Sequence, residues 1–454
     1  MKEEAFILTK SQKELEKKLS SFLNSSERIF LLTGKPGVGK TTMTKTCLKE
    51  YIYNDIETQA KGGNIHLAGI TLSHQAKNVL GEHIPNVFTF ASAYGLKEHY
   101  NEDGSRTFEY NKYQEDTPVG ECAIPVFVHD EVSQYTPEML RIVLEKTPIF
   151  SKIIFIGDKA QLPPIDPEKK MKPDEDSPVF ELSLPDECKH ELTERVRQAK
   201  GNPILELSDI IREEIFGSQN IKRILEAIAV PKINKEQGYS FVPYSGLNEH
   251  LKDKNQLETC VIAFRNKTVN HFNINIRNFL LDNPSDDVIE GDIICMSDNY
   301  YHKQGNDIMY VLHNSDMFRI GKVFTKVLRH STNKKTYKID VYVGNILGEK
   351  KQIIVPTPSG RIALEKALKE IADKCKIGQA KWETFWDFKK IFCSCTYGYA
   401  ITAYKAQGST YRSVYVDIND ILMTKPLTAK RKLQTIYTAI TRASHDVYFL
   451  KARL

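Results

Sequence analysis

Short apolar runs alternate with amphipathic segments along the first half of the chain, and each run ends in a polar or glycine-containing turn. This alternation is typical of a parallel α/β sheet, in which strands and covering helices follow one another. Such sheets bind ligands at the carboxyl ends of their strands. The expected strands of this half are Ile29–Leu32, His66–Ile70, Val126–Val128 and Ile153–Ile156.

The later part of the chain repeats this arrangement. Strand-like runs return at Cys260–Phe264, Val414–Val416 and Val447–Leu450. The sequence therefore predicts an α/β protein of two tandem units, with one domain at residues 1–196 and a second at 197–454. The 454 residues leave room for two or three domains of ordinary size.

Two intervals interrupt the alternation, and we expect both to be insertions. In the first unit, the Asp103-Gly104 turn signal separates Glu98–Asn101 from Arg106–Tyr110, which indicates a β-hairpin at about 96–125. The second interval lies at about 291–394. There Val323–Leu328 and Tyr337–Val343 are β-like, and the following helix-like stretch lets us expect a small β-rich subdomain with a helix at Arg361–Cys375.

The amino-acid composition narrows the class of protein but does not indicate a particular function. Hydrophobic residues make up 41% and charged residues 27% of the chain, as in ordinary globular proteins. The 63 basic against 58 acidic residues give a net charge of +5, which permits a nucleic-acid partner but does not require one. The eight cysteines lack zinc-binding spacing, and neither a signal segment nor a membrane-spanning run is recognised. We expect reduced thiols, no membrane partner and a cytoplasmic location.

The strongest chemical signal is the segment Gly34–Thr41 (GKPGVGKT), because it lies between an expected strand and an expected helix. Backbone N–H groups of such a glycine-rich loop surround a phosphate, and the helix N-terminus adds its positive end. The lysine reaches the β- and γ-phosphates, and the hydroxyl after it ligates Mg²⁺. The residues expected to bind a nucleoside triphosphate here are Gly34, Gly37, Gly39, Lys40, Thr41 and Thr42.

A second signal is the carboxylate pair Asp130 and Glu131, delivered by the apolar strand Val126–Val128. Hydrolysis of a phosphoanhydride needs a metal ligand and a base for water, so Asp130 is expected to share the Mg²⁺ with Thr41 while Glu131 serves as the base. An ordinary acidic turn is the alternative. A third signal is Gln161, in Ile156–Pro164, whose amide can sense the γ-phosphate. Taken alone, this segment is better interpreted as a solvated turn.

The order of these motifs resembles that of the superfamily 1 helicases, and within them the RecD and Dda-type branch. The segments that carry the resemblance are Gly34–Thr42 (GKPGVGKTT), Asp130–Gln134 (DEVSQ), Gly157–Pro164 (GDKAQLPP), Tyr399–Thr410 (YAITAYKAQGST) and Tyr437–Ala443 (YTAITRA), with Leu8–Gln12, Leu192–Gln198, Val261–Lys267 and Trp382–Asp387 as further matches. The resemblance implies two RecA-like P-loop domains, an SH3-like tower as the second insertion, and ATP with Mg²⁺ as cofactors.

The resemblance also implies roles at the nucleotide. Gln12 would contact the adenine, although Thr9 and Gln12 also suit a capping box at a helix start. Gln161 becomes the γ-phosphate sensor. Arg197 and Arg442 match two arginines that reach the γ-phosphate across a cleft, although for either arginine alone a surface salt bridge is the better interpretation.

By the same resemblance, a nucleic-acid strand would be bound by hydroxyls, lysines and aromatic faces. The expected contacts are Ser73, His74, Lys77, Thr89, Thr402, Tyr404, Lys405 and Ser409. Helix-capping hydroxyls and solvated lysines are the alternative for these residues. Tyr404 replaces the family's usual histidine, and Thr89-Phe90-Ala91 replaces its Thr-x-His. Phe108, or Tyr100 in its place, would be the wedge that splits duplex, unless Phe108 only packs its own hairpin.

The sequence is thus interpreted as an ATP-dependent DNA helicase that translocates 5′ to 3′, driven by cleft closure between two RecA-like domains. The polarity comes wholly from the resemblance. Expected partners are single-stranded DNA and forked duplex DNA, with a single-strand-binding protein, and the form expected is a monomer from a phage replication system. An RNA-directed member of the superfamily and an ATP-switched loading module without translocation stay as alternatives.

Overall fold

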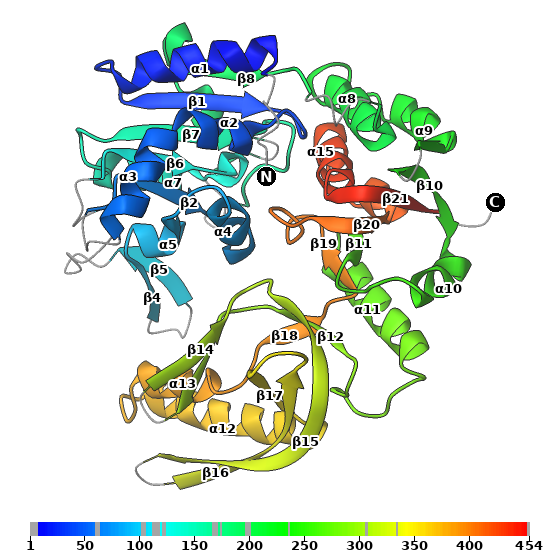
Figure 1. Ribbon diagram of the computed structural model, residues 1–454. Helices are drawn as coiled ribbons and strands as arrows, with labels where there is room; N and C mark the ends of the chain where they lie inside the picture. The colour runs from blue at the N-terminus through cyan, green and yellow to red at the C-terminus, as the bar shows by residue number, and fades with distance from the viewer. Residues whose placement is uncertain are drawn as a thin grey trace. The chain divides into compact units, whose positions relative to one another are not determined.

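The computed structural model describes residues 8–59, 64–100, 106–110, 119, 124–165, 171–172, 175–195, 201–234, 237–304, 307–332 and 335–451. These residues divide into two compact units. Figure 1 labels their helices and strands. The first contains the described residues within 1–96, 110–241 and 406–451, and the second those within 97–109 and 242–405. The units are interleaved along the chain. The division into two domains at residue 196 stays a prediction.

A six-stranded sheet forms the centre of the first unit. Its order is β3-β2-β6-β7-β1-β8, and the neighbours are parallel. The strands are β1 (Ile29–Gly34), β2 (Leu67–Thr71), β3 (Val87–Thr89), β6 (Val126–His129), β7 (Lys152–Gly157) and β8 (Lys189–Leu192). The predicted α/β class is confirmed, and all four expected strands of this half are present.

Both faces of this sheet are buried, because successive side chains of a strand point to opposite sides. Phe30 and Leu32 of β1 pack into one core, whereas Leu31 packs into the other. The helices around the sheet are α1 (Lys10–Leu23), α2 (Lys40–Cys47), α3 (Lys49–Gln59), α4 (His74–Gly81), α5 (Phe90–Ala93) and α7 (Pro137–Lys146), with short 3₁₀ turns η1 (Val132–Gln134), η2 (Pro178–Glu181) and η3 (Asp186–Cys188).

The register of the sheet aligns the carboxyl ends of its central strands. Thr33 of β1 pairs with Gly157 of β7, and His129 of β6 pairs with Phe155. The loops that begin at Gly34, Asp130 and Asp158 therefore start side by side. On the outer strands, Thr71 of β2 pairs with Thr89 of β3, which places a second pair of loops together.

The first unit also contains a smaller group of strands and helices from later in the chain. Its strands follow the order β20-β21-β10-β9, and β20 and β21 are parallel. Val414–Val416 and Val447–Leu450 were expected as strands and lie in β20 and β21. The elements are α8 (Pro203–Phe216), α9 (Ile221–Ala229), β9 (Lys232–Asn234), β10 (Gln237–Pro243), β20 (Tyr411–Val416), α14 (Ile418–Met423), α15 (Ala429–Ile440) and β21 (Ala443–Lys451).

The second unit combines a short parallel pair with a β-rich insertion. The pair is β11 (Thr259–Ala263) and β19 (Ala400–Thr402), packed by α11 (Asn266–Leu280). A five-stranded sheet of order β17-β16-β15-β12-β18 forms the insertion. The remaining elements are η5 (Tyr244–Gly246), α10 (Leu247–Lys252), β12 (Ile293–Met296), β13 (Tyr300–Gln304), β14 (Asp307–Leu312), β15 (Met317–Thr332), β16 (Lys335–Ile346), β17 (Gln352–Pro356), α12 (Pro358–Lys376), α13 (Trp382–Lys389) and β18 (Cys395–Tyr397).

The insertion is organised by the same alternation of side chains. Ile339 and Val341 of β16 pack with Ile371 of α12, whereas Tyr342 packs with the core on the opposite face. The two expected strands lie within β15 and β16, and the expected helix lies within α12. The stem of the insertion is the antiparallel pair β12 and β18, in which Met296 pairs with Cys395. Its likeness to an SH3 domain stays a prediction.

The expected hairpin is present as the paired strands β4 (Leu96–Tyr100) and β5 (Arg106–Tyr110). Its turn at Asp103-Gly104 lies outside the described residues, and so do the side chains of Tyr100 and Phe108. In the part of the chain that the structure describes, no helix combines the length and apolar character needed to cross a bilayer.

Candidate active site

The loop from Gly34 to Lys40 has the backbone that phosphate binding requires. Gly37 and Gly39 have φ angles of 76° and 83°, which favour glycine, and Gly39 caps the start of α2. A Cβ on Gly34 would lie 2.9 Å from the Leu192 carbonyl oxygen, so this strand end also needs glycine. Lys40 Nζ donates to Gly34 O at 2.7 Å, which holds the ammonium within the loop.

Gln12 supports this loop from α1. Its Oε1 accepts from the Thr9 backbone N–H at 3.0 Å, and Thr9 Oγ1 accepts from the Gln12 N–H, which confirms the capping box. Gln12 Nε2 donates to Val38 O at 3.0 Å and the side chain is fully buried. Gln12 therefore ties the helix start to the phosphate loop. Its contact with adenine stays a prediction.

Asp130 and Glu131 follow β6 at the adjacent strand end. The Asp130 N–H donates to Ile70 O at 2.9 Å, and Glu131 has a φ angle of 55°, in the left-handed region. Burial, followed by the charge of Glu131, raises the pKa of Asp130 to about 7, and the charge of Lys40 acts in the opposite direction. The phosphate-loop lysine and the carboxylate pair therefore share one site.

This site fits Mg²⁺. Thr41 opens α2 beside Lys40, and a hydroxyl with a carboxylate is the hard oxygen donor set that Mg²⁺ prefers. Mg²⁺ is ordinarily held by one or two protein groups together with substrate phosphates. Among the residues that the structure describes, there is no cluster of three or more His, Cys, Asp or Glu that could hold a metal ion by itself.

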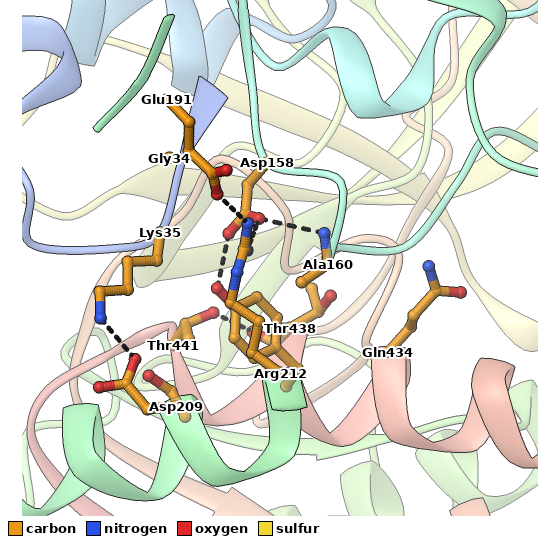
Figure 2. Close-up of polar contacts among 12 residues, drawn as sticks. Gly34, Lys35, Asp158, Ala160, Glu191, Asp209, Arg212, Gln434, Thr438 and Thr441 are labelled. Carbon is orange, nitrogen blue, oxygen red and sulfur yellow. Dashed lines mark hydrogen bonds and ion pairs between the residues drawn. The ribbon is translucent and has the colours of Figure 1, made fainter. Parts of the chain in front are cut away.

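Asp158 joins three segments of the first unit. Its carboxylate is fully buried and accepts from the Arg212 guanidinium of α8, from the Ala160 N–H at 3.0 Å, and from the Tyr437 hydroxyl of α15 at 2.6 Å (Figure 2). Arg212 also donates to Glu191 at 3.1 Å. Breaking a buried ion pair typically costs about 3–5 kcal/mol of folding free energy. Asp158 therefore holds these segments together strongly.

Gln161 lies three residues after Asp158 in the chain. Its side chain is 5% exposed, and its buried Oε1 has no hydrogen-bond partner among the described residues. A buried amide oxygen without a partner is available to a water or a phosphate-bound group. The next residue is fixed twice, since Leu162 N–H donates to Thr438 Oγ1 at 3.1 Å and Leu162 O accepts from Gln407 Nε2 at 3.3 Å.

Arg442 follows α15 and is 7% exposed. Its Nε donates to Thr438 O at 3.1 Å and its Nη2 donates to Thr441 Oγ1 at 3.2 Å. These bonds use two of the five guanidinium N–H groups and fix the direction of the rest. The other expected arginine, Arg197, lies outside the described residues.

The contacts made by α8 were not predicted from the sequence. Asp209 Oδ1 lies 3.0 Å from Lys35 Nζ of the phosphate loop and 2.7 Å from Arg195 Nη2, and Figure 2 shows the Lys35 pair. Asp209 and Arg212 are one helical turn apart, so they face the same side. This i, i+3 spacing of opposite charges was visible in the sequence, but its partners were not.

The expected nucleic-acid residues of the first unit gather at the outer strand ends. Ser73 and Thr89 are the N-caps of α4 and α5, so the helix-capping interpretation is confirmed for both. Each cap uses an oxygen lone pair and leaves the hydroxyl hydrogen to donate. Ser409 Oγ donates to Gln75 Oε1 of α4, which brings Ser409 beside Ser73. His74 and Lys77 lie on the first turn of α4.

In the second unit, three expected residues lie at the end of β19 or just after it. Thr402 Oγ1 accepts from the Lys405 N–H at 3.3 Å, and Lys405 Nζ donates to Met296 O of β12 at 2.8 Å. The Tyr404 ring packs edge-on against Phe264, with 6.4 Å between centroids. Lys405 therefore binds the stem of the insertion, and its contact with nucleic acid stays a prediction.

Comparison with known proteins agrees with this site. Residues 19–167 match the AAA domain family, and residues 397–450 match the UvrD-like helicase C-terminal domain. The chain is 26% identical over 471 residues to the ATP-dependent DNA helicase dda of Enterobacteria phage T4, with 98% of this chain and 99% of the relative covered.

Two solved structures share the fold. One is a structure of two coordinating Pif1 helicases at forked double-stranded DNA, with a TM-score of 0.52, 16% identity, and 97% of this chain and 92% of that chain covered. The other is a Pif1 helicase from Bacteroides in complex with ADP-AlF3 and single-stranded DNA, with a TM-score of 0.51, 15% identity and the same coverage. The two family matches and the full-length similarity to dda support a superfamily 1 helicase, and the likeness to the Pif1 structures shows a shared fold.

Proposed function

We propose that this chain is an ATP-dependent DNA helicase that translocates 5′ to 3′ on single-stranded DNA and separates the duplex ahead of it. The observation that carries the proposal is the direct bonding between two helicase motifs. Tyr437 and Thr438, just before Arg442, bond to Asp158 and to the residue after Gln161. A γ-phosphate bound between Gln161 and Arg442 would thus contact two segments that are hydrogen-bonded to each other.

At the nucleotide, each residue has a separate task. Lys40 binds the β- and γ-phosphates, and Glu131 accepts the proton of the attacking water while Gln161 orients it. Thr41 and Asp130 would hold Mg²⁺, which would neutralise charge on the phosphates. Arg442 stabilises the charge that develops on the transferred group, and we assign the same role to Arg197. Gln12 contacts the adenine.

We infer that ATP draws two RecA-like domains, residues 1–196 and 197–454, together and that hydrolysis releases them. Gln161 belongs to the first domain and Arg442 to the second, so the γ-phosphate is the group that both recognise. When the γ-phosphate is lost, the contact that favours the closed over the open arrangement of the two domains is lost with it. Each cycle then shifts one domain along the strand relative to the other.

Single-stranded DNA is the proposed track, with forked duplex as the substrate. The free hydroxyl hydrogens of Ser73 and Thr89 can donate to phosphates, and the ammonium groups of Lys77 and Lys405 add charge. His74, Thr402 and Ser409 complete the phosphate contacts, and Tyr404 offers a face for stacking. We propose that the working form is a monomer and that a single-strand-binding protein is a partner in phage-type replication.

Forked DNA with one single-stranded tail tests activity and polarity together. We expect ATP-dependent unwinding of the fork with a 5′ tail and none of the fork with a 3′ tail, measured by release of a labelled strand. Lys40→Ala is the inactive control because it removes the phosphate-loop ammonium. Unwinding from the 3′ tail alone would reverse the polarity. ATPase activity that DNA stimulates without any strand release would favour the loading module, and stimulation by oligo-U but not oligo-dT would favour an RNA track.

The β4–β5 hairpin supplies a separate prediction. An aromatic ring at the fork can stack on the last base pair and replace about 1–3 kcal/mol of lost stacking per base. We expect Phe108→Ala to keep DNA-stimulated ATP hydrolysis and to slow strand separation by about tenfold. Tyr100→Ala tests the alternative wedge, and selective slowing of strand separation in this variant alone would assign the wedge to Tyr100. Equal loss of both activities in Phe108→Ala would mean that the ring only packs its hairpin.

A further inference from the structure

A buried polar chain lies directly behind the carboxylate pair. It runs through His129, the last residue of β6, whose side chain is fully buried. His129 Nδ1 is 3.0 Å from the Tyr135 hydroxyl, and Nε2 is 3.3 Å from the Tyr94 hydroxyl. The Tyr94 hydroxyl continues to Thr147 Oγ1 at 3.0 Å. None of the four side chains takes part in the proposed chemistry.

The ring at the centre of this chain can take either of two neutral tautomers, because each ring nitrogen faces a tyrosine hydroxyl that can donate or accept. In one arrangement, Tyr135 donates to Nδ1 and Nε2–H donates to Tyr94. In the other, Tyr94 donates to Nε2 and Nδ1–H donates to Tyr135, whose own hydrogen then turns elsewhere. The hydrogen bonds can therefore run in two directions through the ring, which Tyr94 and Tyr135 flank.

The two tyrosines that flank the ring, Tyr135 and Tyr94, belong to different functional segments. Tyr135 directly follows η1, which begins after Glu131, and burial together with the charges of Tyr94 and Asp130 raises the pKa of Tyr135 well above its usual value. Tyr94 directly follows α5, whose N-cap is Thr89. The Phe90 ring of α5 contacts both Tyr94 and Tyr135, at centroid distances of 4.8 and 5.5 Å. One packed cluster thus joins the Thr89 segment to the Glu131 turn.

We propose that His129 is a positioning residue that couples the nucleic-acid segment at Thr89 to the orientation of Glu131, and so sets how strongly nucleic acid stimulates ATP hydrolysis. The inference rests on the proposed function. A contact at Thr89 shifts α5, α5 shifts the Tyr94 hydroxyl, and the imidazole passes that shift to Tyr135 and the turn beside it. Buried cores transmit such shifts because they are close-packed.

A satisfied core histidine is the competing interpretation, since both ring nitrogens have partners. That interpretation predicts lower stability and a parallel change in every activity when His129 is replaced. Coupling instead predicts a selective change in stimulation. The two are distinguished by the ratio of stimulated to unstimulated kcat.

The test compares the wild-type protein with three variants of the full chain, His129→Phe, Tyr94→Phe and Tyr135→Phe. Each variant keeps an aromatic ring of similar volume and removes hydrogen bonds. ATPase rates are measured with and without saturating oligo-dT. We expect each variant to lower the ratio of stimulated to unstimulated kcat by about tenfold, with the KM for ATP and the half-saturating oligo-dT concentration unchanged. Tyr239→Phe is the control, because it removes another buried hydroxyl bond of the first unit, to Ala227 O at 3.3 Å.

A wild-type ratio in all three variants, or an equal fall in stimulated and unstimulated rates, would overturn the coupling role and leave the proposed function intact. If His129→Phe does not fold, the two tyrosine variants decide, since each removes a single hydroxyl. A wild-type rate that neither oligo-dT nor oligo-U raises would overturn the proposed function, and the coupling with it.

Discussion

Replacing Arg442 with alanine is expected to lower the kcat of ATP hydrolysis by about 10³–10⁵-fold, the range known for an arginine that stabilises phosphoryl transfer. Two of its N–H groups bond to Thr438 O and Thr441 Oγ1, so the guanidinium is preorganised before a phosphate arrives. A charge fixed in this way acts without reorganising during the reaction. Single-turnover hydrolysis with saturating ATP measures the effect on the chemical step directly.

Two further variants locate the cause of that loss. Arg442→Lys keeps the charge but loses the planar fork, and it should recover only a small part of the rate. Arg412→Ala removes an exposed arginine of β20 in the same unit and should leave kcat near the wild-type value. If Arg442→Ala retains a rate within tenfold of wild type, Arg442 does not reach the γ-phosphate.

Glu131→Gln is expected to lower kcat by about 10²–10⁴-fold, the usual contribution of a general base, while ATP still binds. Glutamine keeps the size of the side chain and cannot accept the proton of water. The same substitution removes the charge that, after burial, does most to raise the pKa of Asp130. The pKa of Asp130 should therefore fall, and Mg²⁺ should bind more tightly near pH 6 than in the wild-type protein.

The binding readout separates the two roles of the carboxylates. Wild-type Asp130, with a pKa of about 7, is protonated below that pH, so affinity for Mg²⁺ and ATP should weaken as the pH falls from 8 to 6. Glu131→Gln should flatten this dependence, as measured by fluorescent nucleotide titration at both pH values. An unchanged kcat in Glu131→Gln would transfer the role of base to another group.

The sequence was sufficient wherever local pattern decides structure. β1 and β7 were predicted because apolar runs bounded by Gly34 and Gly157 are typical of buried parallel strands. The parallel register then brings the Gly34, Asp130 and Asp158 loops together without further information. The capping box of Thr9 and Gln12 was likewise legible from its spacing of three residues.

Contacts between residues far apart in the chain could not be predicted from the sequence. The bonds of Asp158 to Arg212 and Tyr437 join positions far apart in the chain, and nothing local marks them as partners. The same holds for Lys35 and Asp209. His129 lies just beyond the predicted strand Val126–Val128, and a single sequence does not reveal that Tyr94 and Tyr135 meet its ring. The interleaving of the two compact units has the same cause, since it depends on which distant segments pack together.

The stem of the β-rich insertion has an evolutionary consequence. The chain departs at Met296 and returns at Cys395, and these two residues are paired across neighbouring strands. A segment whose ends adjoin can be gained or lost in one genetic event while the elements on either side, α11 and β19, keep their places. Relatives of this protein can therefore differ widely in the size of this insertion and still share the elements on either side of it.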